Sequence, residues 1–266
     1  MGIRWAVQKF IQTSHATLYP GIESYTKNDL MRKFTISLLL LVASVASQAQ
    51  SKQIEIRPFQ TLRAYGPFRV TLVASDKEQI EIVCTGIDEG EVVIDSDDGD
   101  LSMKLRNKHY WNDWNDSRSH QQRYVKVTVY FKKLTKIDVE AGASVVSDFT
   151  ITSPSLLLVS KMGAEMRLDV ATKELELDSS MGSEVVLTGT TETFEITSKM
   201  GSTVKANHLK SEKVWVKAYM GSDVSVYASK ELDASAGFGA TINFDGDPSV
   251  RNTSHSFGGE TTATRR

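Results

Sequence analysis

The residues best suited to chemistry gather in one polar stretch that lies between two strand patterns. It runs from residue 107 to residue 121 and combines aromatic rings with amides and carboxylates. Long loops in compact domains are usually functional or disordered. Aromatic faces pack on sugar rings while amides bond hydroxyl groups, so this stretch resembles a sugar-binding surface in composition. The candidate binding residues are Tyr110, Trp111, Asn112, Trp114 and Asn115. The alternative is a loop whose aromatic residues fold back over the edge of the fold.

Two sets of polar residues have the side chains that metals prefer, but neither has a convincing spacing. One set lies in the same stretch and comprises His109, Asp113, Asp116 and His120; it matches no established metal motif, and solvated loop residues explain it better. The other is a periodic acidic column of Glu165, Glu184, Asp223 and Glu260, which threonines interrupt. The glycine–aspartate nonapeptide of calcium-binding β-rolls is absent from the sequence. We expect no metal site and no cofactor.

The sequence carries no recognisable catalytic motif. It has no glycine-rich phosphate loop, no Ser/His/Asp set and no context for a nucleophilic cysteine. Polysaccharide lyases and hydrolases built on β-helices need converging carboxylates or an acid–base pair in a groove. The outward positions of this chain hold Lys, Ser, Thr and Glu without such a recurring cluster. We therefore expect a protein that is not an enzyme; the alternative is a polysaccharide-acting β-helix lyase or hydrolase.

The element that must position these residues is a repeat of about 19 residues. A glycine in a short fixed context marks each repeat, and successive glycines lie 21, 19, 19, 20, 18 and 19 residues apart. A fixed period near twenty in a β-rich sequence indicates a solenoid, whose coils bury their apolar faces only against one another. The repeat glycines are Gly142, Gly163, Gly182, Gly201, Gly221, Gly239 and Gly258.

Within one coil, apolar and small residues alternate with polar ones, which predicts one buried face of extended chain. The alternating set is Leu175, Leu177, Ser179, Met181, Ser183, Val185 and Leu187, and we expect it to point inward. The glycine is expected at a corner, because it lacks a Cβ, and the Met or Phe before it is expected to fill the core. The polar positions between them, from Glu174 to Glu184, suit a wet face. An antiparallel sandwich would explain the strand spacing but not the shared register of all these columns.

The first 49 residues have the pattern of a signal for export. Residues 31–33 give a positively charged start, residues 34–45 form an apolar run, and Ser47-Gln48-Ala49 supplies small residues before a cleavage site. We expect a signal peptide over 31–49 that is cleaved after Ala49. Residues 1–30 are then an upstream gene-model extension with Met31 as the true start; the alternative is a long n-region. We expect no transmembrane segment after cleavage.

The chain beyond the signal is acidic and forms one β domain. It holds 26 basic and 31 acidic side chains, a net charge of about −5, which makes nucleic acid and anionic membranes unlikely partners. Cys84, the single cysteine, lies in a strand pattern and is expected to pack as a small buried apolar group. We divide residues 50–262 into irregular N-terminal coils (50–133) and regular glycine-marked coils (134–262), followed by a tail at 263–266.

Several of these segments together resemble the head GIN domain, a family described as an autotransporter adhesin and common in exported proteins of Bacteroidetes. The resemblance lies in the opening at Phe59 and 65–72, the segment 98–101, the strand at 125–134 leading into 137–144, and the glycine repeats. It covers residues 54–262 and implies an all-β, single-domain, right-handed β-helix-like solenoid. It also implies an exported protein of the adhesin type, in the periplasm, on the outer-membrane surface or outside the cell. The exported repeat scaffold, the aromatic stretch at 107–121 and the lack of a catalytic set together predict a cell-surface or envelope protein that binds a glycan or a protein. The family brings no catalytic residues to transfer.

Overall fold

The computed structural model describes residues 52–106 and 123–264, which lie in one compact unit of the chain. These residues are mostly in strands, and the one helical segment among them is the 3-10 turn η2 (Glu89–Glu91). Across these two ranges no helix is long and apolar enough to span a bilayer. The signal at 31–49 and the aromatic stretch 107–121 lie outside the described residues.

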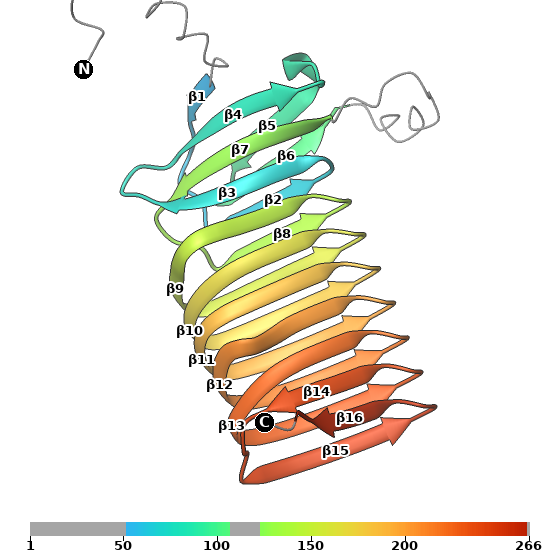
Figure 1. Ribbon diagram of the computed structural model, residues 1–266. Helices are drawn as coiled ribbons and strands as arrows, with labels where there is room; N and C mark the ends of the chain where they lie inside the picture. The colour runs from blue at the N-terminus through green and yellow to red at the C-terminus, as the bar shows by residue number, and fades with distance from the viewer. Residues whose placement is uncertain (1–51, 107–122, 265–266) are drawn as a thin grey trace, which may run out of the picture. The chain divides into compact units, whose positions relative to one another are not determined.

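The strands fall into an irregular N-terminal set and a regular set of coils (Figure 1). The first set comprises β1 (Lys52–Glu55), β2 (Thr61–Tyr65), β3 (Phe68–Ala74), β4 (Gln79–Thr85), β5 (Val92–Asp97), β6 (Asp100–Leu105), β7 (Tyr124–Phe131) and β8 (Lys136–Glu140). The second comprises β9 (Ser144–Lys161), β10 (Glu165–Ser180), β11 (Glu184–Lys199), β12 (Thr203–Tyr219), β13 (Asp223–Gly237), β14 (Thr241–Asp245), β15 (Val250–Ser256) and β16 (Glu260–Ala263).

Each long strand of the regular set runs through two legs joined by a wide bend. The first legs pair in parallel from β3 through β9 to β14 and β16, and the second legs pair in parallel from β2 and β8 to β15. The result is a flattened solenoid whose two layers face each other across the core (Figure 1). Among the strands of residues 52–106 and 123–264, antiparallel pairs occur only toward the N-terminus, in β1–β4, β4–β7 and β5–β6.

The columns predicted from the repeat are the columns of the core. Leu175, Leu177, Val185 and Leu187 are at most 2% exposed, and each pairs in register with its equivalent in an adjacent coil. The small residues beside the glycines are also buried, and their hydroxyl groups link neighbouring coils. Ser183 Oγ, for example, donates to the Ser160 carbonyl oxygen at 2.9 Å. The predicted all-β solenoid with coils of about 19 residues is therefore confirmed.

The turns differ from the prediction. Each marker glycine and the residue before it have positive φ, +57° at Met181 and +70° at Gly182, as the central residues of a type I′ turn do. The chain reverses there within two residues, so the inward alternation does not continue through the turn. Met181 is 48% exposed, and the prediction that Met or Phe fills the core is wrong. Ser180, predicted for the wet face, is buried.

The repeat glycines stack as predicted. The N–H of Gly163 donates to the Met181 carbonyl oxygen at 3.0 Å, and that of Gly182 donates to Met200 at 3.1 Å. The same bond recurs from Gly142 to Gly239, so the turns form a ladder of their own along one edge of the solenoid. Because nothing lies within 4 Å of a Cβ built on Gly182, its requirement for glycine is conformational rather than steric.

The wide bend at the opposite edge is less regular. Gly189 has φ +107°, and a Cβ there would lie 2.1 Å from the Val170 carbonyl oxygen of the preceding coil. The parallel register also shifts in this region. Ala206 pairs with Val226 and Ser211 with Ala228, so β12 has more residues than β13 between the same two paired positions. These extra residues change the outer surface of the bend without disturbing the two legs.

Candidate functional site

The outer surface of the wide bend carries a polar hollow of about 490 Å³. It spans four coils, β10 to β13, where the register shifts of β11 and β12 displace successive bends from one another. Its lining is rich in hydroxyl groups and has one aromatic ring. The lining residues are Thr172, Thr190, Thr191, Glu192, Lys210, Ser211, Glu212, Tyr227 and Ser229.

Hydrogen bonds fix the hydroxyl groups at the floor of this bend hollow. Thr172 Oγ1 donates to Thr191 Oγ1 at 2.9 Å, and Thr191 Oγ1 donates to the Thr193 carbonyl oxygen at 3.0 Å. Ser229 Oγ donates to the Ser211 carbonyl oxygen at 3.2 Å. Thr191 and Ser211 are buried, so the floor is a preformed arrangement and not a set of freely rotating surface hydroxyls.

Charged and aromatic side chains form the rim of the bend hollow. Lys210 Nζ lies 3.7 Å from the centroid of the Tyr227 ring, a cation–π contact that holds both side chains over the hollow. The carboxylate of Glu212, which lines the hollow, is paired with Lys230 Nζ at 2.6 Å; Lys230 itself is not part of the lining. An aromatic ring beside ordered hydroxyl groups, an amine and carboxylates can bind a polyhydroxylated ligand through stacking and hydrogen bonds.

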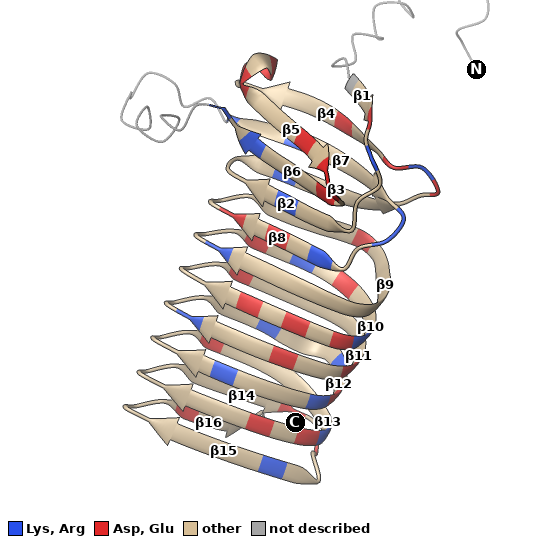
Figure 2. Ribbon diagram, turned by 180° about the vertical axis from the view of Figure 1, so that it is seen from behind, with Lys and Arg blue, Asp and Glu red and all other residues tan. Residues whose placement is uncertain are grey.

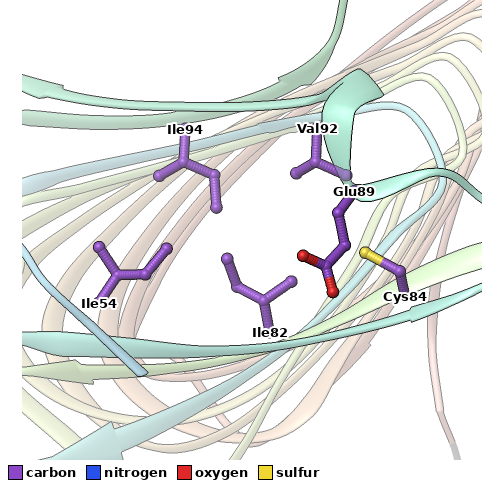
Figure 3. A pocket seen from close by; sticks show the side chains of 6 residues that line it. All are labelled: Ile54, Ile82, Cys84, Glu89, Val92 and Ile94. Carbon is purple, nitrogen blue, oxygen red and sulfur yellow. The ribbon is translucent and has the colours of Figure 1, made fainter. Parts of the chain in front are cut away.

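A second, smaller pocket of about 170 Å³ lies between strands β4 and β5 of the N-terminal set. Figure 3 shows the aliphatic side chains of Ile54, Ile82, Val92 and Ile94 pointing into it, with the Glu89 carboxylate beside the Cys84 sulfur. Cys84 packs against the core, but it is only partly buried and not buried as the strand pattern predicts. The volume is below the range of about 300–1,000 Å³ that is usual for small-molecule sites, so we do not assign a ligand to it.

The acidic column lies on the outer face of the first legs, where Glu165 pairs with Glu184. Glu184 contacts Lys205 Nζ at 2.8 Å, and the hydrogen bond and charge of that lysine lower the pKa of the Glu184 carboxyl. Within the described ranges, no three or more His, Cys, Asp or Glu side chains are placed to share a metal ion. The column is a solvated charged face.

The binding residues predicted from the sequence, Tyr110, Trp111, Asn112, Trp114 and Asn115, lie outside the described residues, as do the four His and Asp residues considered for a metal. The bend hollow was not predicted. Its signal in the sequence is a cluster of Thr, Ser, Lys and Glu at 172, 190–192, 210–212 and 229. These positions keep the period of the repeat. In the sequence they look like ordinary solvated positions, and only the three-dimensional arrangement of the bends shows that they line a hollow.

Comparison with known proteins identifies a family and a fold. The family model described as "Putative auto-transporter adhesin, head GIN domain" matches residues 58–248. Among curated proteins none matches the chain.

Solved structures from Bacteroides and Parabacteroides have a similar fold. A "putative adhesin" from Bacteroides fragilis has a TM-score of 0.69 at 17% identity, with 82% of this chain and 97% of that chain covered. A "putative lipid binding protein" from Parabacteroides distasonis has a TM-score of 0.59 at 16% identity, with 83% and 98% covered. A third, from Parabacteroides merdae and also described as an adhesin, has a TM-score of 0.58 at 14% identity, with the same coverage. At these identities the likeness establishes the fold alone.

Proposed function

The chain belongs to the head GIN domain family, and we propose that it is an exported, non-enzymatic binding module of the adhesin type whose ligand is a glycan. The observation that carries the proposal is the bend hollow. An aromatic ring, ordered hydroxyl groups and charged side chains line this hollow, whose volume is that of a ligand site.

The shape of the hollow favours an extended ligand over a small metabolite. It crosses four successive coils, and its hydroxyl groups recur with the coils, as Thr172 and Thr191 do at equivalent positions. A polysaccharide presents hydroxyl groups along its length and can meet several coils at once. The aromatic stretch at 107–121 is a second proposed contact, through Trp111 and Trp114, with the amides of Asn112 and Asn115.

The proposed location is outside the cytoplasm, as the family's adhesin description and the predicted signal at 31–49 both suggest. Mass spectrometry of the protein from its native cells would decide this. A mature chain that begins at Gln50 in the envelope fraction is the expected result. A cytoplasmic protein that retains residues 1–30 would contradict both export and the choice of Met31 as the start.

Glycan-array binding tests the ligand. We expect Tyr227→Ala to weaken the binding of any glycan that the wild type retains, because it removes the ring of the bend hollow. Tyr227→Phe keeps the ring and is the matched control. A Trp111→Ala/Trp114→Ala double variant reports separately on the aromatic stretch.

Two outcomes would count against the proposal. Binding that Tyr227→Ala leaves unchanged would remove the bend hollow from the site. Release of shorter oligosaccharides from a bound polysaccharide, lost in Glu192→Gln or Glu212→Gln, would instead favour the polysaccharide-acting enzyme, since these two carboxylates line the same hollow.

A further inference from the structure

We propose that the turn edge of the solenoid, on the side opposite the bend hollow, is a self-association surface that pairs with a second copy of the chain in parallel orientation. The surface is the row of residues that precede the repeat glycines, here named the turn row: Met162, Met181, Met200, Met220, Phe238 and Phe257. All six side chains are exposed, from 39% at Met162 to 79% at Phe257. Figure 2 shows the row of turns along one edge, with charged positions on the strands beside it.

The backbone conformation of the turn row disfavours large apolar residues, so folding alone does not explain their presence there. Each has φ between +47° and +57°, a region that costs a residue other than Gly, Asn or Asp about 1–2 kcal/mol. Asn before Gly is the usual sequence of such a turn. Six large apolar residues occupy the position instead, and they stay outside the core. A continuous row of large apolar side chains that the core does not use indicates a contact with a partner.

The spacing of the turn row favours a second copy as that partner. Hydrogen bonds between the turns hold neighbouring members at the spacing of parallel strands, about 4.8 Å. Phe238 and Phe257 stack with their ring centroids 4.8 Å apart, so the side chains keep the same period. Another turn row has the same period over its whole length, and two such rows can therefore interdigitate coil by coil.

The charges beside the turn row select the parallel arrangement. One flank, on the first legs, carries the acidic column of Glu165, Glu184, Asp223 and Glu260, of which Glu184 is paired with Lys205. The other flank, on the second legs, carries Lys199 and Lys161, whose Nζ lies 3.9 Å from an Asp178 carboxylate oxygen. About a two-fold axis parallel to the row, the acidic flank of each copy faces the lysine flank of the other. Two copies running in opposite directions would place acidic flank against acidic flank, which is unfavourable.

The size of the surface predicts a weak dimer. The row extends over five coil spacings, about 24 Å, and is about as wide as two packed sheets, about 10 Å. This footprint is smaller than the roughly 800 Å² per partner of a standard stable interface. Pairing should therefore depend on protein concentration, and would add avidity to a binding module displayed at high density.

Sedimentation velocity over a range of concentrations tests the pairing. We expect a monomer–dimer equilibrium whose dissociation constant rises about tenfold or more in Met181→Asn/Met200→Asn. Asparagine suits the positive φ, so this variant keeps its fold and loses only the apolar surface. Lys161→Glu/Lys199→Glu should weaken pairing as well, and mixing it with Glu165→Lys/Glu184→Lys should restore pairing between the two variants. A wild type that stays monomeric up to about 1 mM overturns the proposal.

Disulfide trapping tests the orientation, in a Cys84→Ala background. Parallel pairing places each residue of the row next to the same residue of the second copy. Met162→Cys and Met220→Cys should therefore each form cross-linked homodimers on oxidation. Glu176→Cys, exposed on the outer face of a second leg, is the control that should not cross-link. If cross-links form efficiently only when Met162→Cys is mixed with Phe257→Cys, the two copies run in opposite directions and the charge argument is wrong.

Binding to phosphatidylcholine vesicles tests the alternative that the turn row contacts a lipid surface and not a second copy of the chain. If monomers bind these vesicles and the Asn double variant does not, the turn row is a lipid contact and the self-association proposal is wrong. Tyr227→Ala should leave pairing unchanged, because the bend hollow lies at the other edge of the coil. Failure of the dimer therefore leaves the proposed glycan site untouched, and failure of glycan binding leaves the dimer untouched.

Discussion

At the residue scale, the main lesson comes from Met181. Period-two alternation through the coil predicts that it points inward, and the structure places it outward. Alternation describes extended chain, whereas two consecutive residues with positive φ reverse the chain and reset the pattern. The sequence contained the signal for this, since an invariant Xaa-Gly between two apolar runs is the pattern of a two-residue turn. The turn was not recognised because Met or Phe stands at Xaa, a position that normally holds Asn or Asp.

We predict opposite effects for two substitutions at Met181. Met181→Asn should leave the free energy of unfolding unchanged or raise it by about 0.5–1 kcal/mol, because Asn tolerates positive φ. Met181→Val should lower it by about 1–2 kcal/mol, because a β-branched residue is a poor fit there. Urea denaturation of both variants measures the difference. Equal stability of the two would show that the backbone cost is not what distinguishes this position.

A second prediction compares two glycines that both have positive φ. Gly182→Ala should cost about 1 kcal/mol, since only the backbone conformation opposes it and the added Cβ has open space. Gly189→Ala should cost several kcal/mol, because its Cβ would lie 2.1 Å from a backbone carbonyl oxygen that cannot move alone. Thermal unfolding of the two variants provides the ranking, and the reverse order would contradict the bend geometry.

At the element scale, the sequence predicts the legs of the coils far better than the bends. Leu175 and Leu177 keep register with Phe194 and Ile196 because each column must bury apolar surface against the next coil. The bends carry no such constraint. β12 accommodates extra residues between Ala206 and Ser211 at the bend, and no local pattern distinguishes them from ordinary polar positions. The bend hollow could not be predicted for that reason.

Adjacent positions of one strand should respond very differently to charge. Val185→Asp should lower the free energy of unfolding by several kcal/mol, because it buries an unpaired carboxylate between the two layers. Glu184→Lys should cost less than about 1 kcal/mol, because Glu184 is on the outer face and loses only its exposed pair with Lys205. Chemical denaturation of both variants tests the inward and outward assignment of this leg.

The Glu184–Lys205 pair also predicts a small dependence of stability on pH. Lys205 lowers the pKa of the folded Glu184 carboxyl below its ordinary value of 4.5. The stabilisation is therefore fully present above that value and is lost as the pH falls through the lowered pKa. We expect Glu184→Gln to destabilise slightly at neutral pH and to match the wild type in acid. Urea midpoints between about pH 6 and about pH 3 measure this, and a parallel offset at every pH would exclude the ion pair as the cause.

At the scale of the whole molecule, a solenoid must end without exposing its core or offering an edge to other chains. The inward columns become polar at the C-terminal coil. Arg251 follows Leu232, Thr253 follows Ala234 and His255 follows Ala236 in the register of β13 and β15. Every residue of β15 is exposed. The last coil therefore covers the core with side chains that water solvates.

Arg251 has the clearest capping role, because its guanidinium carbon lies 5.8 Å from the centroid of the Phe244 ring at the end of the core. We predict that Arg251→Leu/Thr253→Val extends the apolar columns to the surface and causes end-to-end association. Light scattering at increasing concentration should then show large assemblies, whereas the turn row alone gives dimers. Arg251→Lys keeps the charge and should scatter as the wild type does. If the apolar variant stays at the size of the wild type, the unpaired backbone of β15 is protected by something other than the polarity of its inward face, and the capping account of this coil is wrong.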